Sequence, residues 1–302
     1  MTKKEKITNE KVKKFLTKTG FLLEMEVVEI LKKSGYRVKV NQHFLDLEEG
    51  KKREIDIVAE KKINNVNIIL TIECKQSLQD SWIFICSEKQ PPRYYANLKH
   101  LPLAHNLHKS RLFNDTHRFN QKIPLAQNYI VIDKYSEKKS NSLQIDECIY
   151  KLPKALIGTA AEISTKDKTI FFPVSVFSGQ IFTASYENEL RVDESYIVQY
   201  NTSLESKFYK KKERNRLLIS PTEPDYDGSI YSFESIKPSD SELGQILDIS
   251  EKLIPRFQID FVTKDGMISY LNIIEEGVRK ISTRKWTYNL YLRPPKLPKF
   301  KN

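Results

Sequence analysis

The sequence predicts an α/β protein. A helix-like pattern at residues 9–34 precedes three short strand-like runs, a second helical pattern starts at residue 143, and another apolar strand-like run follows it. Because helices and strands bury their apolar surfaces by stacking helices on a sheet, this mixture favours a layered α/β core.

The first helix is predicted from apolar side chains that recur near one side of residues 9–34, with Gly35 as a typical stop. The three strands that follow are predicted at residues 36–44, 52–59 and 67–75. Short connections that contain Gly and Asn separate them. Consecutive hairpin pairing is therefore the economical topology.

Later elements are predicted in the same way. Their boundaries are less sharply defined, because Gly and Pro are the strongest breakers of helices and strands and the chain has only 9 Gly and 13 Pro. We expect Pro153 to kink or split the helix that starts at residue 143. The predicted strands are residues 82–86, 169–177, 180–186, 195–200 and 257–262, and the predicted helices are residues 94–109, 143–163, 242–254 and 267–281.

The charge balance indicates a polyanionic partner. Lys and Arg outnumber Asp and Glu by 50 to 39 over 302 residues, which gives a net charge of +11 and a pI near 9.3. Nucleic acid is the leading candidate for such a partner. A basic protein from a Lys-rich proteome, without a nucleic-acid partner, is the equally weighted alternative.

Other classes are disfavoured. Cys74, Cys86 and Cys148 are odd in number and lack CxxC spacing, which argues against a disulfide framework or closed zinc site and for a reducing compartment. The charged start has no apolar h-region, and no apolar run approaches the ~18 residues of a membrane span. GxxxxGK[ST] is absent, so no ATP site is expected in this chain. We therefore expect a cytoplasmic protein without a membrane partner.

The stretch NVNIILTIECK places two opposite charges at the end of an apolar strand. Because side chains alternate along a strand, Glu73 and Lys75 share one face, while Cys74 points to the other. In REIDIVA the same rule allows Asp56 to approach Glu73 if the two strands pair. Two carboxylates in an apolar sheet are costly unless a cation compensates them, and a divalent metal would do so.

A third acid is predicted from the first helix, where Glu24, Glu26 and Glu29 are the candidates. Relative to Glu24, apolar residues lie at −3, +3, +4 and +7, so Glu24 lies on the apolar stripe. Glu29 can pair with Lys33 one turn on, as surface residues do. We select Glu24, with a Glu at the stripe's edge that reaches solvent as the alternative.

These motifs resemble those of the PD-(D/E)XK nucleases, which have the restriction-endonuclease-like fold. GFLLEMEVVEILKKSGYRV is similar to the opening of Mrr-type restriction endonucleases and archaeal Holliday-junction resolvases, and REIDIVA and IECKQS look like the second and third motifs. Asp56 and Glu73 are 17 residues apart. The resemblance covers residues 20–77, about a fifth of the chain, and Glu54-Ile55 replaces the Pro of the family name.

The resemblance implies a metal site with Mg²⁺ as the cofactor, for which Mn²⁺ can substitute. Asp56 and Glu73 would bind the ion directly, the backbone carbonyl of Cys74 would complete the protein ligands, and Glu24 would hold the ion through water. Mg²⁺ suits this donor set because it prefers oxygen and keeps several waters.

The resemblance also implies a catalytic role for Lys75, which would position or deprotonate the attacking water or stabilise the transition state. Gln76 continues the strand and could hydrogen-bond at the site. The catalytic set is therefore Glu24, Asp56, Glu73 and Lys75.

FFPVSVFSGQIF is similar, more weakly, to a late core strand and hairpin in uncharacterised members. The resemblance implies a restriction-endonuclease-like αβββαβ core with a central mixed sheet flanked by helices. On this basis residues 1–200 are the nuclease-like core, residues 78–140 are an insertion, and residues 201–302 are a C-terminal α/β extension with a basic tail. Many nucleases of this fold dimerise to cut both strands, so a homodimer is one expectation.

Nucleic-acid binding is predicted at FYKKKERNR, where cations lie among aromatic residues; a solvated charge run is the alternative. The candidate phosphate-binding residues are Lys210, Lys211, Lys212, Arg214 and Arg216.

The predicted function is a Mg²⁺-dependent DNA endonuclease. The alternatives are a catalytically inactive nuclease-fold protein that binds nucleic acid or scaffolds a complex, and a nuclease that acts on RNA or branched DNA.

Overall fold

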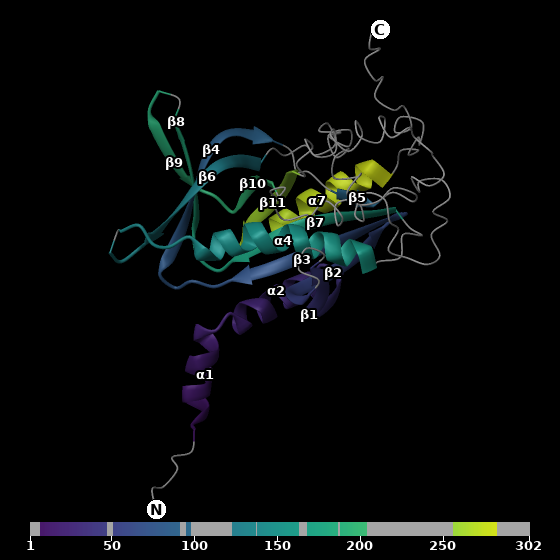
Figure 1. The fold of residues 1–302 in the computed structure, drawn as a ribbon, viewed down its shortest axis with the longest axis horizontal. Helices are drawn as coiled ribbons and strands as arrows, with labels where there is room; N and C mark the ends of the chain where they lie inside the picture. The colour runs from purple at the N-terminus through teal and green to yellow at the C-terminus, as the bar shows by residue number, and fades with distance from the viewer. Residues whose placement is uncertain are drawn as a thin grey trace, which may run out of the picture.

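The computed structural model describes residues 7–46, 51–90, 95–97, 123–136, 138–162, 168–186, 188–203 and 256–282. A large mixed sheet carries helices on its faces (Figure 1), which confirms the predicted α/β class. The elements are α1 (Asn9–Lys18), α2 (Phe21–Lys33), β1 (Arg37–Asp46), β2 (Lys51–Ile63), β3 (Val66–Lys75), β4 (Asp80–Gln90), β5 (Tyr95–Asn97), β6 (Ile123–Asp133), α4 (Leu143–Glu162), β7 (Lys168–Phe177), β8 (Ile181–Tyr186), β9 (Leu190–Glu194), β10 (Ile197–Ser203), β11 (Arg256–Thr263) and α7 (Met267–Ser282).

The sheet has the strand order β1-β2-β3-β7-β11-β10-β6-β4-β8-β9, with β5 paired to β7. The pairs β1–β2 and β2–β3 are antiparallel, which confirms the predicted consecutive hairpins. The turn between β2 and β3 uses Asn64 at φ 54°, a left-handed conformation that Asn tolerates and a two-residue hairpin needs. β3 then runs parallel to β7, and β7 parallel to β11. Three neighbouring parallel strands therefore end at one edge of the sheet.

Helices α2 and α7 cover one face of the sheet, and α4 covers the other (Figure 1). The alternation predicted for β3 is confirmed, because Ile68, Ile72 and Cys74 are buried in the layer beneath α2 and α7. On the opposite face, α4 packs through a buried stripe against aromatic side chains of the sheet. Members of that second layer are Ile145, Cys148, Leu152, Ala155, Phe44, Trp82, Phe84, Phe177 and Phe261.

The helix predicted at residues 9–34 is interrupted. Thr19 has extended backbone angles (φ −89°, ψ 153°) that end α1, and α2 begins at Phe21. Thr and Gly are weak helix formers, so the Thr19-Gly20 step is where a continuous helix is least favoured. α1 then points away from the sheet (Figure 1), and Phe15 is 66% exposed. Phe21, predicted on the buried stripe, is 51% exposed.

Two further predictions are wrong. Tyr95–Asn97, at the start of the helix predicted for residues 94–109, forms β5 and pairs with Thr169–Phe171 of β7. The hairpin predicted within FFPVSVFSGQIF is not formed, because β8 pairs with β4 and β9 instead of β7. Both differences have one physical reason: β7 is hydrogen-bonded to β3 along one edge and to β5 and β11 along the other, which leaves no edge for β8.

The later segments contribute to the same sheet. Residues 78–140, predicted as an insertion, supply β4 and β6, and the predicted C-terminal extension supplies β11 and α7. Pro153 lies inside α4, which is not split. The helix predicted at residues 242–254 and the basic tail lie outside the described residues. None of the helices in the described ranges is long and apolar enough to cross a membrane.

Candidate active site

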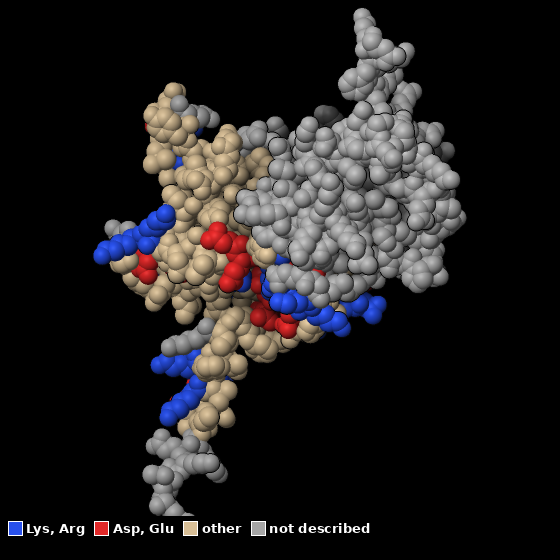
Figure 2. Space-filling model, in the orientation of Figure 1, with Lys and Arg blue, Asp and Glu red and all other residues tan. Residues whose placement is uncertain are grey.

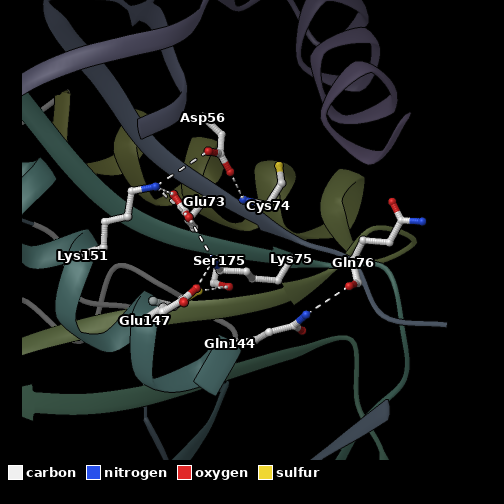
Figure 3. Close-up of polar contacts among 10 residues, drawn as sticks. Asp56, Glu73, Cys74, Lys75, Gln76, Gln144, Glu147, Lys151 and Ser175 are labelled. Carbon is white, nitrogen blue, oxygen red and sulfur yellow. Dashed lines mark hydrogen bonds and ion pairs between the residues drawn. The ribbon is translucent and has the colours of Figure 1, made fainter. Parts of the chain in front are cut away.

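The site begins where β2 separates from β3. Their pairing ends at Ile57 opposite Ile72, so Asp56 and Glu73 would form the next pair of the ladder. Instead, the Asp56 side chain accepts a hydrogen bond from the backbone N–H of Cys74 through Oδ2 at 2.7 Å (Figure 3). A buried N–H needs a partner, and the carboxylate provides the one that the departing strand no longer offers. Asp56 is thereby held beside the end of β3.

Glu73 and Lys75 extend from the end of β3 toward α4. Glu73 is only 3% exposed, and its Oε1 lies 3.1 Å from the Nζ of Lys75. The prediction that these two side chains share a face is therefore confirmed. The Cys74 thiol is buried in the opposite apolar layer, where burial raises its pKa well above the ordinary value. A thiol in that state is not a metal ligand, as expected when only the backbone of Cys74 was assigned to the site.

Helix α4 contributes two charged residues that the sequence reasoning missed. Glu147 Oε2 accepts a hydrogen bond from Lys75 Nζ at 2.7 Å. Lys151, one turn further, places its Nζ 2.6 and 2.8 Å from the two carboxylate oxygens of Glu73 and 3.9 Å from Asp56 Oδ1 (Figure 3). The only sequence signal was a Glu and a Lys at i and i+4, which usually indicates an exposed helical pair.

The position of α4 is maintained by a buried ion pair. Lys154 Nζ lies 3.1 Å from Asp46 Oδ2 at the end of β1, and both side chains are less than 5% exposed. The same Asp46 oxygen accepts a hydrogen bond from Arg53 of β2 at 2.8 Å. Because breaking a buried pair leaves an uncompensated charge, this contact ties α4 to the β1–β2 hairpin. Glu147 and Lys151 are thus held over the end of β3.

The carboxylates of the site repel one another. Burial raises the pKa of Glu73, and the nearby Asp56 charge raises it further, while Lys151 and Lys75 oppose the shift. Burial also raises the pKa of Glu24, and the charges of Asp56 and Glu73 add to this effect. Glu24 on α2 is therefore electrostatically coupled to both acids, although it is only half-buried. Closely spaced carboxylates favour a cation between them.

Lys75 is stabilised in its charged form. Burial alone would lower its pKa, but the hydrogen bond to Glu147 and the charge of Glu73 outweigh burial and raise the pKa above the ordinary value. Lys75 is therefore an ammonium group at neutral pH. Such a group can donate hydrogen bonds and stabilise negative charge.

The other two acids of α2 have separate partners. Glu29 pairs with Lys33 at 3.5 Å on the surface, which confirms the predicted i, i+4 pair. Glu26 contacts Lys264, in the turn after β11, at 3.0 Å. The choice of Glu24 as the acid directed toward Asp56 and Glu73 agrees with this placement.

The donors present fit a hard divalent cation. Asp56 and Glu73 supply carboxylate oxygens. The Cys74 carbonyl points to the same side of β3 as its N–H, toward Asp56, because a strand residue exchanges both backbone bonds with one neighbour. Across the described ranges, no three His, Cys, Asp or Glu side chains are arranged to hold a metal ion. Two carboxylates, one carbonyl and waters are a set that Mg²⁺ accepts.

Gln76 follows Lys75 but points elsewhere. Its backbone carbonyl accepts a hydrogen bond from Gln144 of α4 at 3.2 Å, while its side chain points away from Asp56 and Glu73 (Figure 3). Gln76 lines a cleft of about 440 Å³ at the carboxyl ends of β3, β7 and β11, together with Ser178, Tyr196 and Lys264. The structure thus places the Gln76 side chain beside the site, apart from the charged groups of Asp56, Glu73, Lys75, Glu147 and Lys151.

On the face drawn in Figure 2, acidic side chains gather near the centre, over α4 and β3, with Lys and Arg side chains to either side. The five cations predicted to bind nucleic acid lie outside the described residues. They are Lys210, Lys211, Lys212, Arg214 and Arg216.

No family model, curated protein or solved structure matches this chain.

Proposed function

We propose that the chain is a Mg²⁺-dependent endonuclease that hydrolyses DNA phosphodiester bonds. The observation that carries this proposal is the placement of Asp56 on the Cys74 N–H, directly beside the Glu73–Lys75 pair. The arrangement combines hard oxygen donors with an ammonium group at one sheet end. Metal-dependent phosphodiester hydrolysis uses a divalent ion to activate water and a cationic group to stabilise the charge that develops on the phosphate.

Asp56, Glu73 and the Cys74 carbonyl would hold the ion, and Glu24 would reach it through water. When bound, Mg²⁺ would lower the pKa of a water molecule and neutralise charge on the scissile phosphate. Mn²⁺, which also accepts oxygen donors, would substitute for it. The protein's own contribution is to fix the two carboxylates, through the Cys74 N–H for Asp56 and through lysines for Glu73.

Lys75 would act on the phosphate as a cation. Its raised pKa favours stabilisation of the transition-state charge, or orientation of the attacking water by donation, over removal of a proton. Glu147 would keep the ammonium group in place through its 2.7 Å contact. DNA is proposed as the partner because the net charge of +11 favours a polyanion.

A nuclease-fold protein without catalysis is the second candidate, and one observation favours it. Lys151 and Lys75 already compensate Glu73, so the carboxylates have cationic partners without a metal. Such a protein would bind nucleic acid or scaffold a complex. Action on RNA or branched DNA is a variant of the first proposal and requires the same site.

The deciding experiment incubates plasmid, linear duplex, single-stranded DNA, branched DNA and RNA with wild-type protein in Mg²⁺ or EDTA. We expect cleavage of DNA only in Mg²⁺, and a loss of about 100-fold or more in Lys75→Ala, as for other charge-stabilising groups. Lys33→Ala, which removes an exposed lysine paired with Glu29 on α2, is the matched control and should cleave normally.

Intact substrates in every lane would contradict the enzyme and favour the scaffold. Equal cleavage by wild type and Lys75→Ala would exclude this site as its source.

A further inference from the structure

Lys151 has an unusual position for a lysine in a carboxylate site. It extends from the middle of α4, and its Nζ contacts both oxygens of Glu73, at 2.6 and 2.8 Å, and lies 3.9 Å from Asp56 Oδ1 (Figure 3). These are the two side chains assigned to the metal. The ammonium group therefore lies where an ion shared by the two carboxylates would lie.

Lys151 and a metal ion cannot occupy the position beside Glu73 and Asp56 at the same time. Mg²⁺ binds oxygen at about 2.0–2.1 Å and demands near-octahedral geometry. The Lys151 ammonium group donates a hydrogen bond to Glu73 Oε1 at 2.8 Å and lies 2.6 Å from Oε2, so it occupies the space in which a metal ion would bind these oxygens. The two cations would also repel each other at short range in a partly buried place. For a metal ion to enter, Lys151 has to leave.

Lys75, unlike Lys151, does not have to move away when a metal ion binds. Its contact with Glu73 is longer, at 3.1 Å, and its shorter contact, at 2.7 Å, is with Glu147, which is not one of the metal ligands. Lys75 therefore has a partner that retains it when Glu73 turns to a metal ion. Lys151 is 27% exposed, so its flexible side chain has a route to solvent.

We propose that Lys151 is an exchangeable counterion that neutralises Asp56 and Glu73 in the metal-free protein and is displaced when a divalent cation binds. This inference rests on the proposed function and adds a means of regulating the same site. Before the metal arrives, Lys151 keeps two repelling carboxylates together and the end of β3 intact. It also raises the concentration of divalent ion that the site needs.

The direction in which metal affinity changes distinguishes a competing cation from a residue that helps to bind the metal. Removal of a residue that helps to bind the metal weakens binding, whereas removal of a competing cation strengthens it. Lys151→Gln should therefore bind Mn²⁺ more tightly than the wild type in calorimetric titration, by about tenfold for the loss of one nearby charge. Lys151→Arg keeps the charge and should stay within about threefold of the wild type.

Thermal unfolding provides a second measurement that needs no substrate. Without metal, Lys151→Gln should melt below the wild type, because Asp56 and Glu73 lose their counterion. Added Mn²⁺ should raise its melting temperature by more than it raises that of the wild type. Lys33→Gln removes one positive charge from the exposed Glu29 pair and is the control for net charge; its Mn²⁺ affinity should stay unchanged.

Equal or weaker Mn²⁺ binding by Lys151→Gln would overturn the exchange, even if the wild type cleaves DNA. An equal rise in affinity in Lys33→Gln would also overturn the exchange, because the effect would then follow from net charge alone. If neither the wild type nor the two Lys151 variants bind Mn²⁺, the protein has no metal site here, and the proposed function is contradicted as well.

Discussion

The carboxylate of Asp56 accepts a hydrogen bond from the backbone N–H of Cys74 at 2.7 Å, at the point where β2 leaves β3. One side chain thus completes the hydrogen bonding of β3 and also presents an oxygen to Glu73. Structural and chemical roles meet in the same carboxylate. Substitutions at Asp56 can separate them.

Asp56→Ala should destabilise the protein by about 1–3 kcal/mol, because the Cys74 N–H loses its acceptor. Asp56→Asn retains an oxygen for this N–H and should lie within about 1 kcal/mol of the wild type, yet bind Mn²⁺ much more weakly. Urea denaturation and calorimetric titration measure the two effects. Equal destabilisation by Ala and Asn would show that the hydrogen bond does not hold the strand end.

Glu147→Gln should lower the pKa of Lys75, since the hydrogen bond to Glu147 is the leading contribution that raises it. If Lys75 acts as a cation, its charge persists to high pH in the wild type and is lost at lower pH in the variant. The alkaline limb of the pH–rate profile for cleavage should therefore move to lower pH.

Glu29→Gln is the control for Glu147→Gln, because it also removes an acid that pairs with a lysine on a helix, but at an exposed position. Its profile should match that of the wild type. An unchanged alkaline limb in Glu147→Gln would argue against the cationic role of Lys75.

Asp260 should make stability depend on pH. Burial raises its pKa to about 7 from the ordinary 3.8, although the Tyr270 hydroxyl donates a hydrogen bond to it at 2.7 Å. The folded state therefore binds a proton between about pH 4 and 7 that the unfolded state has released, and stability falls as pH rises through this window. The loss approaches about 4 kcal/mol above pH 7.

Asp260→Asn removes this proton linkage. Urea denaturation at pH 5 and pH 8 should show a smaller difference for the variant than for the wild type, and greater stability of the variant at pH 8. Asp265→Asn, an exposed carboxylate in the turn after β11, is the control and should retain the wild-type difference. The same slope in Asp260→Asn and wild type would refute the assignment.

Features that depend on neighbours along the chain could be predicted from the sequence. The period of two in NVNIILTIECK placed Glu73 and Lys75 on one face and Cys74 on the other, and the structure confirms both. The short Asn turn predicted the β2–β3 hairpin, which set Asp56 next to Glu73. A period near 3.6 predicted Glu24 on the apolar stripe, where it is half-buried, and Glu29 in a surface pair with Lys33, which is formed.

Other features were decided by packing between distant segments. Residues 95–97 form a strand because they pair with the part of a β7 edge that β3 and β11 do not cover. β8 does not pair with β7, because β3, β5 and β11 already occupy both of its edges. Asp80–Gln90 and Arg256–Thr263 lie in the same sheet as the site. No local pattern reports which edges of a strand other segments will occupy.

The sequence by itself determined that Asp56, Glu73 and Lys75 would meet at one end of the sheet, because local periodicity and short turns set the face and register of each strand. Only the tertiary structure decided what lies opposite them. Glu147 and Lys151 reach the site because α4 packs across β3, held by Lys154 and Asp46, which are 108 residues apart in the chain. A contact between residues so far apart in the chain depends on how whole elements bury their apolar faces against one another. The sequence around Lys154 and Asp46 therefore does not predict it.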